Sequence, residues 1–219
     1  MKSETKYNKG FSLIELVVAM AITSFVMAGI VSAYVSQLKS HVTQQMVVEM
    51  QQNLRSAMQH MEKEIRMAGY DFDPNVSSVA GVTIALASTF AFTMDLNEDG
   101  DVSDANETVT YTLDLKADGT QCLMRNTGGG NVPVAEYIDA LNFVYLDANR
   151  SPTNVAGQVR SVQITIVARS NRANPGFFRR QIDNQVYRNQ QGAIVLPARN
   201  DTFRRMAITS DIMCRNLYF

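Results

Sequence analysis

The chain has few of the residues that carry catalysis or bind transition metals. Its 219 residues include only two cysteines and two histidines. Cys122 and Cys214 do not form a CxxC metal motif, and His41 and His60 fall in a segment that we predict to be one helix. A nucleophile elbow and a phosphate-binding loop are also missing. The sequence therefore argues against a zinc site, a Cys/His nucleophile and enzymatic activity.

Charge is almost absent from one long segment near the N-terminus. Lysines occur before it, but between Phe11 and Gln37 the only charged residue is Glu15. This run is longer than the ~20 apolar residues that span a bilayer, and the preceding lysines place its N-terminal end in the cytoplasm. No small-x-small cleavage site follows the run, unlike in a secretory signal peptide. A plain anchor would not explain Glu15, because a carboxylate inside a membrane is costly and usually marks a function.

The residues at the start of this run resemble a known processing signal. Lys9 to Glu15 read KGFSLIE, which is similar to the signature of type IV prepilins and type II secretion pseudopilins. In that family a membrane peptidase cleaves after the glycine and N-methylates the new terminal residue. The resemblance implies that residues 1–10 are a leader, that the bond between Gly10 and Phe11 is cleaved, and that Phe11 is methylated. It also implies an inner-membrane protein with a periplasmic head, in which Glu15 pairs with the α-amino group of a neighbouring subunit.

Helix breakers are missing from a long stretch of the chain. No proline occurs before Pro74, and glycine is absent from residues 31–68. Apolar side chains recur there at spacings of three and four, which predicts one helix from about Ser12 to about Met67. Gly69 then occupies the position of a C-cap glycine.

Composition divides this predicted helix into two parts. Residues 11–38 form the transmembrane and polymerisation segment, and residues 39–70 form an amphipathic part that packs on the head, residues 71–219. We expect a methionine stripe in the second part to lie in the core rather than to form a partner surface, namely Met46, Met50, Met58 and Met61.

Short alternating runs replace the helical pattern in the head. The expected fold class is α+β and pilin-like, with the long helix packed on an antiparallel β-sheet head. Residues 170–201 are rich in Asn, Gln and Arg, which predicts a long excursion with a short hairpin at about residues 185–195. Strands are predicted at residues 82–86, 90–94, 108–113, 121–124, 141–145, 159–167 and 206–212.

Two further segments resemble one particular group of pilins. Residues 66–70 (RMAGY) and 136–145 (EYIDALNFVY) are similar to the PilW family of minor pilins. This implies a minor pilin that helps to initiate or cap a type IV pilus, with other pilins, the assembly machinery and the prepilin peptidase as partners. Two alternatives stay open: a minor, J-like pseudopilin of a type II secretion system, and a tip adhesin or DNA-binding subunit.

One acidic loop, residues 95–107, has the spacing of a calcium site. Oxygen-bearing side chains recur at alternate positions before Gly100, as in an EF-hand loop, but the twelfth position is Asn106 rather than an acid. The flanking segments are predicted strands, so we expect a structural calcium ion at a hairpin tip, with a solvated turn as the alternative. The predicted ligands are Asp95, Asn97, Asp99, Asp101, Asp104 and Glu107.

The positions of the cysteines and of the arginines in the sequence leave two questions open. A periplasmic head would permit a disulfide between Cys122 and Cys214, and the alternative is two small buried thiols. Residues 71–147 hold 13 acidic and 2 basic side chains, whereas residues 150–219 hold 11 basic and 3 acidic ones. The two halves either neutralise each other or leave a basic face for nucleic acid, a partner that no motif supports.

Overall fold

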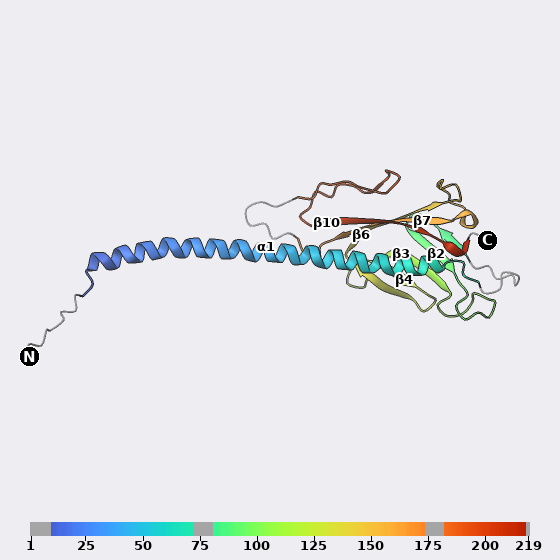
Figure 1. The fold of residues 1–219 in the computed structure, drawn as a ribbon, viewed down its shortest axis with the longest axis horizontal. Coiled ribbons are helices and arrows are strands. Elements are labelled where there is room, and N and C mark those ends of the chain that lie inside the picture. The colour runs from blue at the N-terminus through green and yellow to red at the C-terminus, as the bar shows by residue number, and fades with distance from the viewer. Residues whose placement is uncertain (1–9, 72–80, 174–181, 218–219) are drawn as a thin grey trace, which may run out of the picture. The chain divides into compact units, whose positions relative to one another are not determined.

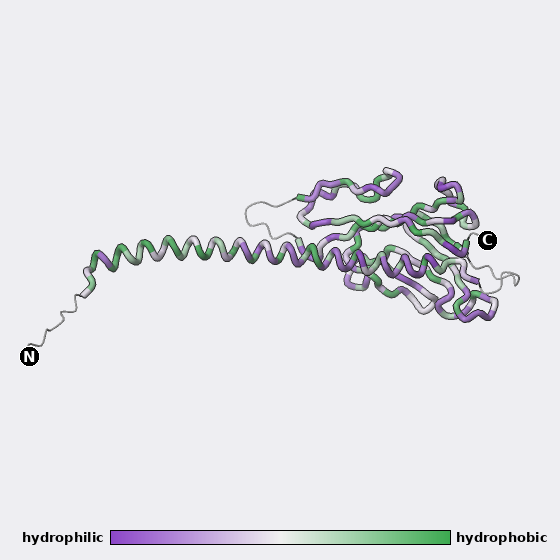
Figure 2. The backbone as a smooth tube through the Cα atoms, in the orientation of Figure 1, coloured by the Kyte–Doolittle hydropathy of each residue, from purple (hydrophilic) through white to green (hydrophobic). Residues whose placement is uncertain are grey.

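The computed structural model describes residues 10–71, 81–173 and 182–217. The chain forms two compact units, Met1–Gln44 and Gln45–Phe219, and one long helix, α1 (Leu13–Met67), contributes to both (Figure 1). The helix has the extent that the absence of proline and glycine predicted. Figure 2 shows that its first half is mainly hydrophobic and that polar residues become frequent in its second half.

In the second unit, one face of α1 is buried. Its buried residues recur every three or four positions, because this spacing returns side chains to the same side of a helix. The predicted methionine stripe is part of this face, so the prediction that it lies in the core is confirmed. The buried residues are Met46, Met50, Leu54, Ala57, Met58, Met61 and Ile65.

Gly69 ends the helix as predicted. Its φ is +76°, a left-handed conformation that favours glycine. The N–H of Gly69 donates to the carbonyl of Thr93 at 2.9 Å, and the N–H of Tyr70 donates to the carbonyl of Met67 at 2.9 Å. The end of α1 is therefore fastened to the neighbouring sheet.

Five strands form one antiparallel sheet in the order β1-β2-β3-β4-β5. Four of them were predicted, whereas the fifth contains Pro133, a residue that weakens any strand signal. Phe90, Phe92 and Tyr111 point from this sheet into the main core, where aromatic rings pack together. The strands are β1 (Val82–Ala85), β2 (Thr89–Thr93), β3 (Thr108–Leu115), β4 (Gln121–Asn126) and β5 (Asn131–Glu136).

A second antiparallel sheet has the order β10-β7-β6, so the described residues of the head form two main sheets rather than the one predicted. The chain passes from the first sheet to the second at Tyr137, whose φ is +58°. This turn of one residue between β5 and β6 carries no strong sequence signal. The strands are β6 (Ile138–Leu146), β7 (Ser161–Arg169) and β10 (Arg205–Met213).

The predicted excursion contains a short hairpin, β8 (Tyr187–Arg188) and β9 (Ile194–Leu196), among its described residues. Tyr187 and Leu196 pack on Ala140 and Val167, so the hairpin covers part of the second sheet. Residues 174–181 of the excursion lie outside the described part of the chain. Two 3₁₀ helices, η1 (Ala156–Gln158) and η2 (Arg215–Leu217), complete the elements of the described residues.

The two cysteines are free and buried, as in the alternative to a disulfide. Cys214 belongs to the main core, together with Leu123 of β4. Successive residues of a strand point to opposite faces, so Cys122, next to Leu123, points away from that core. The two thiols therefore lie on different sides of the first sheet, and the structure does not join them in the disulfide that the sequence left open.

Candidate functional site

The predicted processing site lies immediately before α1. Phe11 is 90% exposed, and a side chain built at Gly10 would meet no atom within 4 Å. The backbone N–H of Ser12 donates to Oε2 of Glu15 at 2.9 Å, and the N–H of Leu16 donates to the carbonyl of Ser12 at 3.2 Å. Glu15 thus caps the first turn, as the glutamate of a capping box does. The Ser-x-x-Glu spacing of residues 12–15 is the sequence signal for this cap.

The first part of α1 exposes a continuous apolar surface. By length and composition, α1 is able to cross a membrane, and the apolar window is not buried. A surface of this kind marks a membrane or a protein partner, because water is a poor solvent for it. Its largest members are Leu13, Ile14, Leu16, Val17, Val18, Met20, Ile22, Phe25, Val26, Met27 and Ile30.

Two of the predicted calcium ligands are buried and face the backbone of the acidic loop. Asp95 is 0% exposed and Glu107 is 1% exposed. The carboxylate of Asp95 accepts hydrogen bonds from the N–H groups of Glu98 at 2.7 Å and Gly100 at 3.1 Å. The carboxylate of Glu107 accepts one from the N–H of Leu96 at 3.1 Å. These side chains hold the loop in shape through its own amides.

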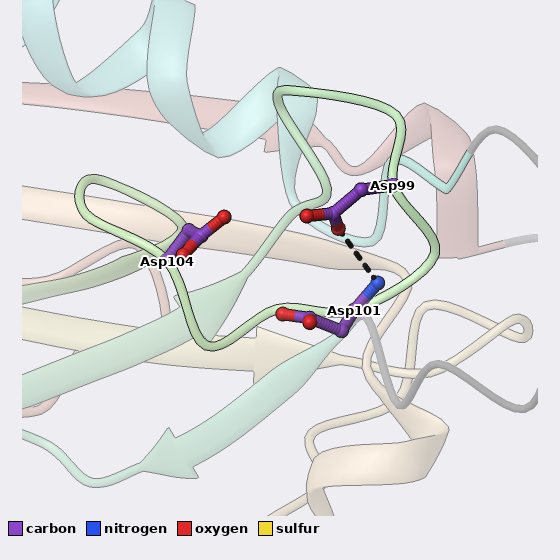
Figure 3. Close-up of side chains that lie close together, drawn as sticks. All are labelled: Asp99, Asp101 and Asp104. Carbon is purple, nitrogen blue, oxygen red and sulfur yellow. Dashed lines mark hydrogen bonds between the residues drawn. The ribbon is translucent and has the colours of Figure 1, made fainter.

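The other acidic side chains converge on the exposed side of the loop. Asp99, Asp101 and Asp104 each place one carboxylate oxygen within 4.8 Å of the others (Figure 3). Nδ2 of Asn97 donates to Oδ2 of Asp99 at 2.9 Å and to Oδ2 of Asp104 at 2.7 Å. The amide therefore offsets part of the negative charge at this point. The three aspartates could hold a metal ion, and they are a smaller set than the six ligands predicted.

Repulsion within this triad affects the protonation of Asp104. The hydrogen bond from Asn97 alone would lower the pKa of Asp104, but the charges of Asp99 and Asp101, together with partial desolvation, outweigh it and raise that pKa. Hydrogen bonds from the N–H and hydroxyl of Ser103 lower the pKa of Asp101. The site therefore concentrates negative charge that a cation would neutralise.

The acidic loop contacts the end of α1 through Tyr70. The N–H of Asp95 donates to the carbonyl of Tyr70 at 2.8 Å, and the hydroxyl of Tyr70 donates to Oε1 of Glu98 at 3.1 Å. This hydrogen bond is the main cause of the raised pKa of Tyr70. These two hydrogen bonds join the acidic loop to the end of α1, so a change in the conformation of one affects the other.

An ion pair that the sequence analysis missed joins α1 to the first sheet. Nη2 of Arg125 lies 2.7 Å from Oε1 of Glu64, and the hydroxyl of Tyr111 also donates to Glu64. Burial and the Glu64 charge raise the pKa of Tyr111. Glu64 and Arg125 are separated by 61 positions, so no local pattern connects them.

A second network holds the excursion on the second sheet. The side chain of Arg205 is 4% exposed, its Nε lies 2.6 Å from Asp139, and its Nη2 lies 2.7 Å from Asp201. Asp183 lies 3.5 Å from the same guanidinium, and Arg169 also pairs with Asp139 at 3.0 Å. Both arginines form ion pairs with carboxylates, so they do not contribute to a basic face for nucleic acid.

Two family models match the chain, and together they indicate the class of protein. A family model described as prepilin peptidase-dependent protein B matches residues 43–188, and one described as the prokaryotic N-terminal methylation motif matches residues 5–31. No curated protein matches the chain. A type IV-like pilin from Thermus thermophilus is 14% identical, with a TM-score of 0.45, over 77% of this chain and 97% of that one.

Proposed function

The chain belongs to the prepilin peptidase-dependent protein B family, and we propose that within it the chain is a minor pilin that helps to initiate or cap a type IV pilus. Its pilin-like fold and N-terminal methylation motif are those of a structural subunit rather than an enzyme. The finer assignment to a PilW-type subunit is supported by the RMAGY segment at residues 66–70, where α1 ends at Gly69.

One observation carries this proposal: an exposed Gly10–Phe11 bond directly precedes a helix whose first half is apolar and unburied. A peptidase needs an accessible bond, and a filament or membrane needs a helix that has no partner within its own head. We therefore propose cleavage between Gly10 and Phe11, methylation of Phe11, and a head on the periplasmic side of the inner membrane.

The first test is the intact mass of the protein extracted from native membranes. Loss of residues 1–10 plus one methyl group is expected in cells that contain a prepilin peptidase. The full-length, unmethylated mass in the same cells would refute the proposal, because the chain would then be only a membrane-anchored head.

The second test concerns assembly through Glu15. In Glu15→Val we expect normal insertion and cleavage but filament incorporation reduced about a hundredfold or more, because leaving the buried charge of the neighbour unpaired costs about 3–5 kcal/mol. Glu15→Gln keeps an oxygen that can accept from Ser12 and lacks only the charge, so it should fail equally. Thr23→Val is the matched control, since it removes a polar group further along α1. Normal incorporation of Glu15→Gln would show that capping, not charge, is what the filament needs.

We also propose that Asp99, Asp101 and Asp104 bind a calcium ion, because a hard cation prefers carboxylate oxygens and the loop has alternate-residue spacing. Isothermal titration of the processed protein in detergent should show binding at millimolar calcium or below, and Asp101→Asn with Asp104→Asn should abolish it. Heat release that persists in the double variant would place calcium elsewhere.

A type II secretion pseudopilin remains the alternative role, and the structural features above are common to both. Deletion of the chain separates the two: we expect loss of pili with secretion intact. Loss of type II secretion with pili intact would support the alternative.

A further inference from the structure

Among the strands that the structure describes, β10 lies at the edge of its sheet and pairs with β7 alone. The register between the two strands is continuous over all nine residues of β10, without a bulge. At the ends of this ladder, the N–H of Cys214 donates to the carbonyl of Arg160 at 2.9 Å, and the N–H of Ser170 donates to the carbonyl of Arg204 at 2.8 Å. Hydrogen-bonded pairs alternate in an antiparallel ladder, so the even-numbered residues of β10 point their backbone groups toward β7.

The odd-numbered residues of β10 therefore direct their N–H and C=O groups away from the sheet. Among the described residues, no backbone or side-chain group pairs with these outward groups. An unpaired row of this length is a template for another strand. The residues in question are Arg205, Ala207, Thr209, Asp211 and Met213.

The two edges of the first sheet carry a proline or a register shift, which discourages such pairing, and β10 carries neither. β5 contains Pro133, and the register of β5 shifts where it pairs with β4. β1 has only four residues and a register shift, and just beyond it the carbonyl of Ala87 accepts from the N–H of Phe143. By contrast, the middle of β10 reads Ala207-Ile208-Thr209-Ser210, which is neutral and free of proline.

A cavity of about 390 Å³ lies where β10 begins. Val47 and Met50 of α1 line one side of it, and Phe203 and Met206 line the side next to β10. In β-strand addition, main-chain hydrogen bonds supply affinity and side-chain pockets supply specificity. Charged side chains, among them Asp183, also line the cavity, so the edge and the cavity together suit an extended segment whose last side chain has both apolar and polar groups.

We propose that the β10 edge binds a β-strand from the head of a different pilin-type subunit, which extends the sheet beyond β10. This rests on the proposed function, because subunits anchored in one membrane by similar segments hold their heads at high effective concentration.

A second copy of this chain fits the edge less well. β10 begins beside Val47, and after it Asn216 donates to the carbonyl of Arg66, so β10 runs in the same direction as α1. Antiparallel pairing of two β10 strands would need two α1 helices of opposite direction, which one membrane does not provide. Parallel pairing of two β10 strands would form slanted hydrogen bonds, which are slightly less stable per residue than those of an antiparallel ladder.

The test uses the full chain in cells that assemble its filament, with a photo-crosslinking residue at exposed Ala207. The same residue at exposed Thr83 of β1 is the matched control. We expect a crosslink from position 207 alone, to a head peptide of another protein that carries the N-terminal methylation motif.

Thr209→Pro removes only an outward N–H, because the ladder bonds to β7 come from the even-numbered residues. It should lower the crosslink from position 207 about tenfold, through the lost donor and the added ring, whereas Thr209→Val should leave it unchanged. If Thr209→Pro does not fold, the crosslink from position 207 in the otherwise unchanged chain tests the docking proposal by itself.

The outcomes separate this inference from the proposed function. An unprocessed chain that still carries residues 1–10 would overturn the proposed function. A processed and incorporated chain with no crosslink from position 207, or with a crosslink only to a second copy, would overturn the docking proposal alone.

Discussion

Replacement of Arg205 by methionine is the most informative single change in the head. The Arg205 side chain is 4% exposed and donates to Asp139 and, through two nitrogens, to Asp201, while Asp183 lies 3.5 Å away. Arg205→Met keeps an unbranched apolar stem but removes the guanidinium cation from among three carboxylates. Asp139 retains Arg169 at 3.0 Å, so the loss falls mainly on Asp201 and Asp183.

Removing one partner of a buried ion pair costs about 3–5 kcal/mol, because the remaining charge stays desolvated and unpaired. Asp139 keeps a partner and the side chain of Asp201 is 34% exposed, so we expect the lower end, about 3 kcal/mol. Arg150→Met is the matched control. Arg150 pairs with Asp211 at 2.6 Å, but its side chain is 65% exposed, and such pairs contribute at most about 1 kcal/mol.

The loss of folding stability in Arg205→Met should also depend on pH. Hydrogen bonds from Arg205 lower the pKa of Asp201 in the folded state. A lowered carboxyl pKa contributes stability above the unfolded value, about 3.9, and that stability is lost as the pH falls through the folded value. The difference between wild type and Arg205→Met should therefore be full at pH 7 and shrink below about pH 4.

Urea unfolding of the processed protein in detergent, followed by the near-ultraviolet circular dichroism of its tyrosines, measures both effects. Equal stability losses for Arg205→Met and Arg150→Met would contradict the reasoning, because burial is what distinguishes the two arginines. A deficit that grew as the pH fell would contradict the assignment to Asp201.

Two further predictions concern the end of α1 and the thiols. Gly69→Ala should destabilise the head by about 1–2 kcal/mol, since φ is +76° and the new methyl group would lie 2.3 Å from Cδ2 of Leu217. Gly119→Ala is the control, because Gly119 has a similar φ of +80° but open space around it. In the same urea assay, Gly119→Ala should lower the stability less than Gly69→Ala does. Burial raises the pKa of Cys214 to about 12, so a thiol reagent at pH 8 should label neither cysteine in the folded protein and both in urea without reductant. Labelling that required reductant would show a disulfide.

Much of the fold could be predicted from the sequence because its signals are local. The apolar run and the absence of proline and glycine define α1, and the α+β class follows from the alternating pattern after it. Gly69 was identified as the helix end for the same reason, since a left-handed C-cap favours glycine over all other residues. The motif around Gly10 and Phe11 indicates processing because a peptidase reads a short contiguous segment.

Features that depend on distant residues required the tertiary structure. The division of the head into two sheets depends on the turn at Tyr137, and the separation of Cys122 from Cys214 depends on which face of β4 each side chain occupies. Loop spacing alone predicted six calcium ligands, but Asp95 and Glu107 turn their oxygens to backbone amides instead.

The sequence by itself determined that this chain has a pilin-type N-terminal segment, a long helix and a β-rich head, because hydrophobicity, helix breakers and the processing motif act over a few neighbouring residues. Only the tertiary structure decided that Arg205 is held by Asp139, that Glu64 pairs with Arg125, and that no described strand covers the outer edge of β10. The two contacts join residues more than sixty positions apart, and the edge depends on the order of distant strands, so no local pattern in the chain encodes these features.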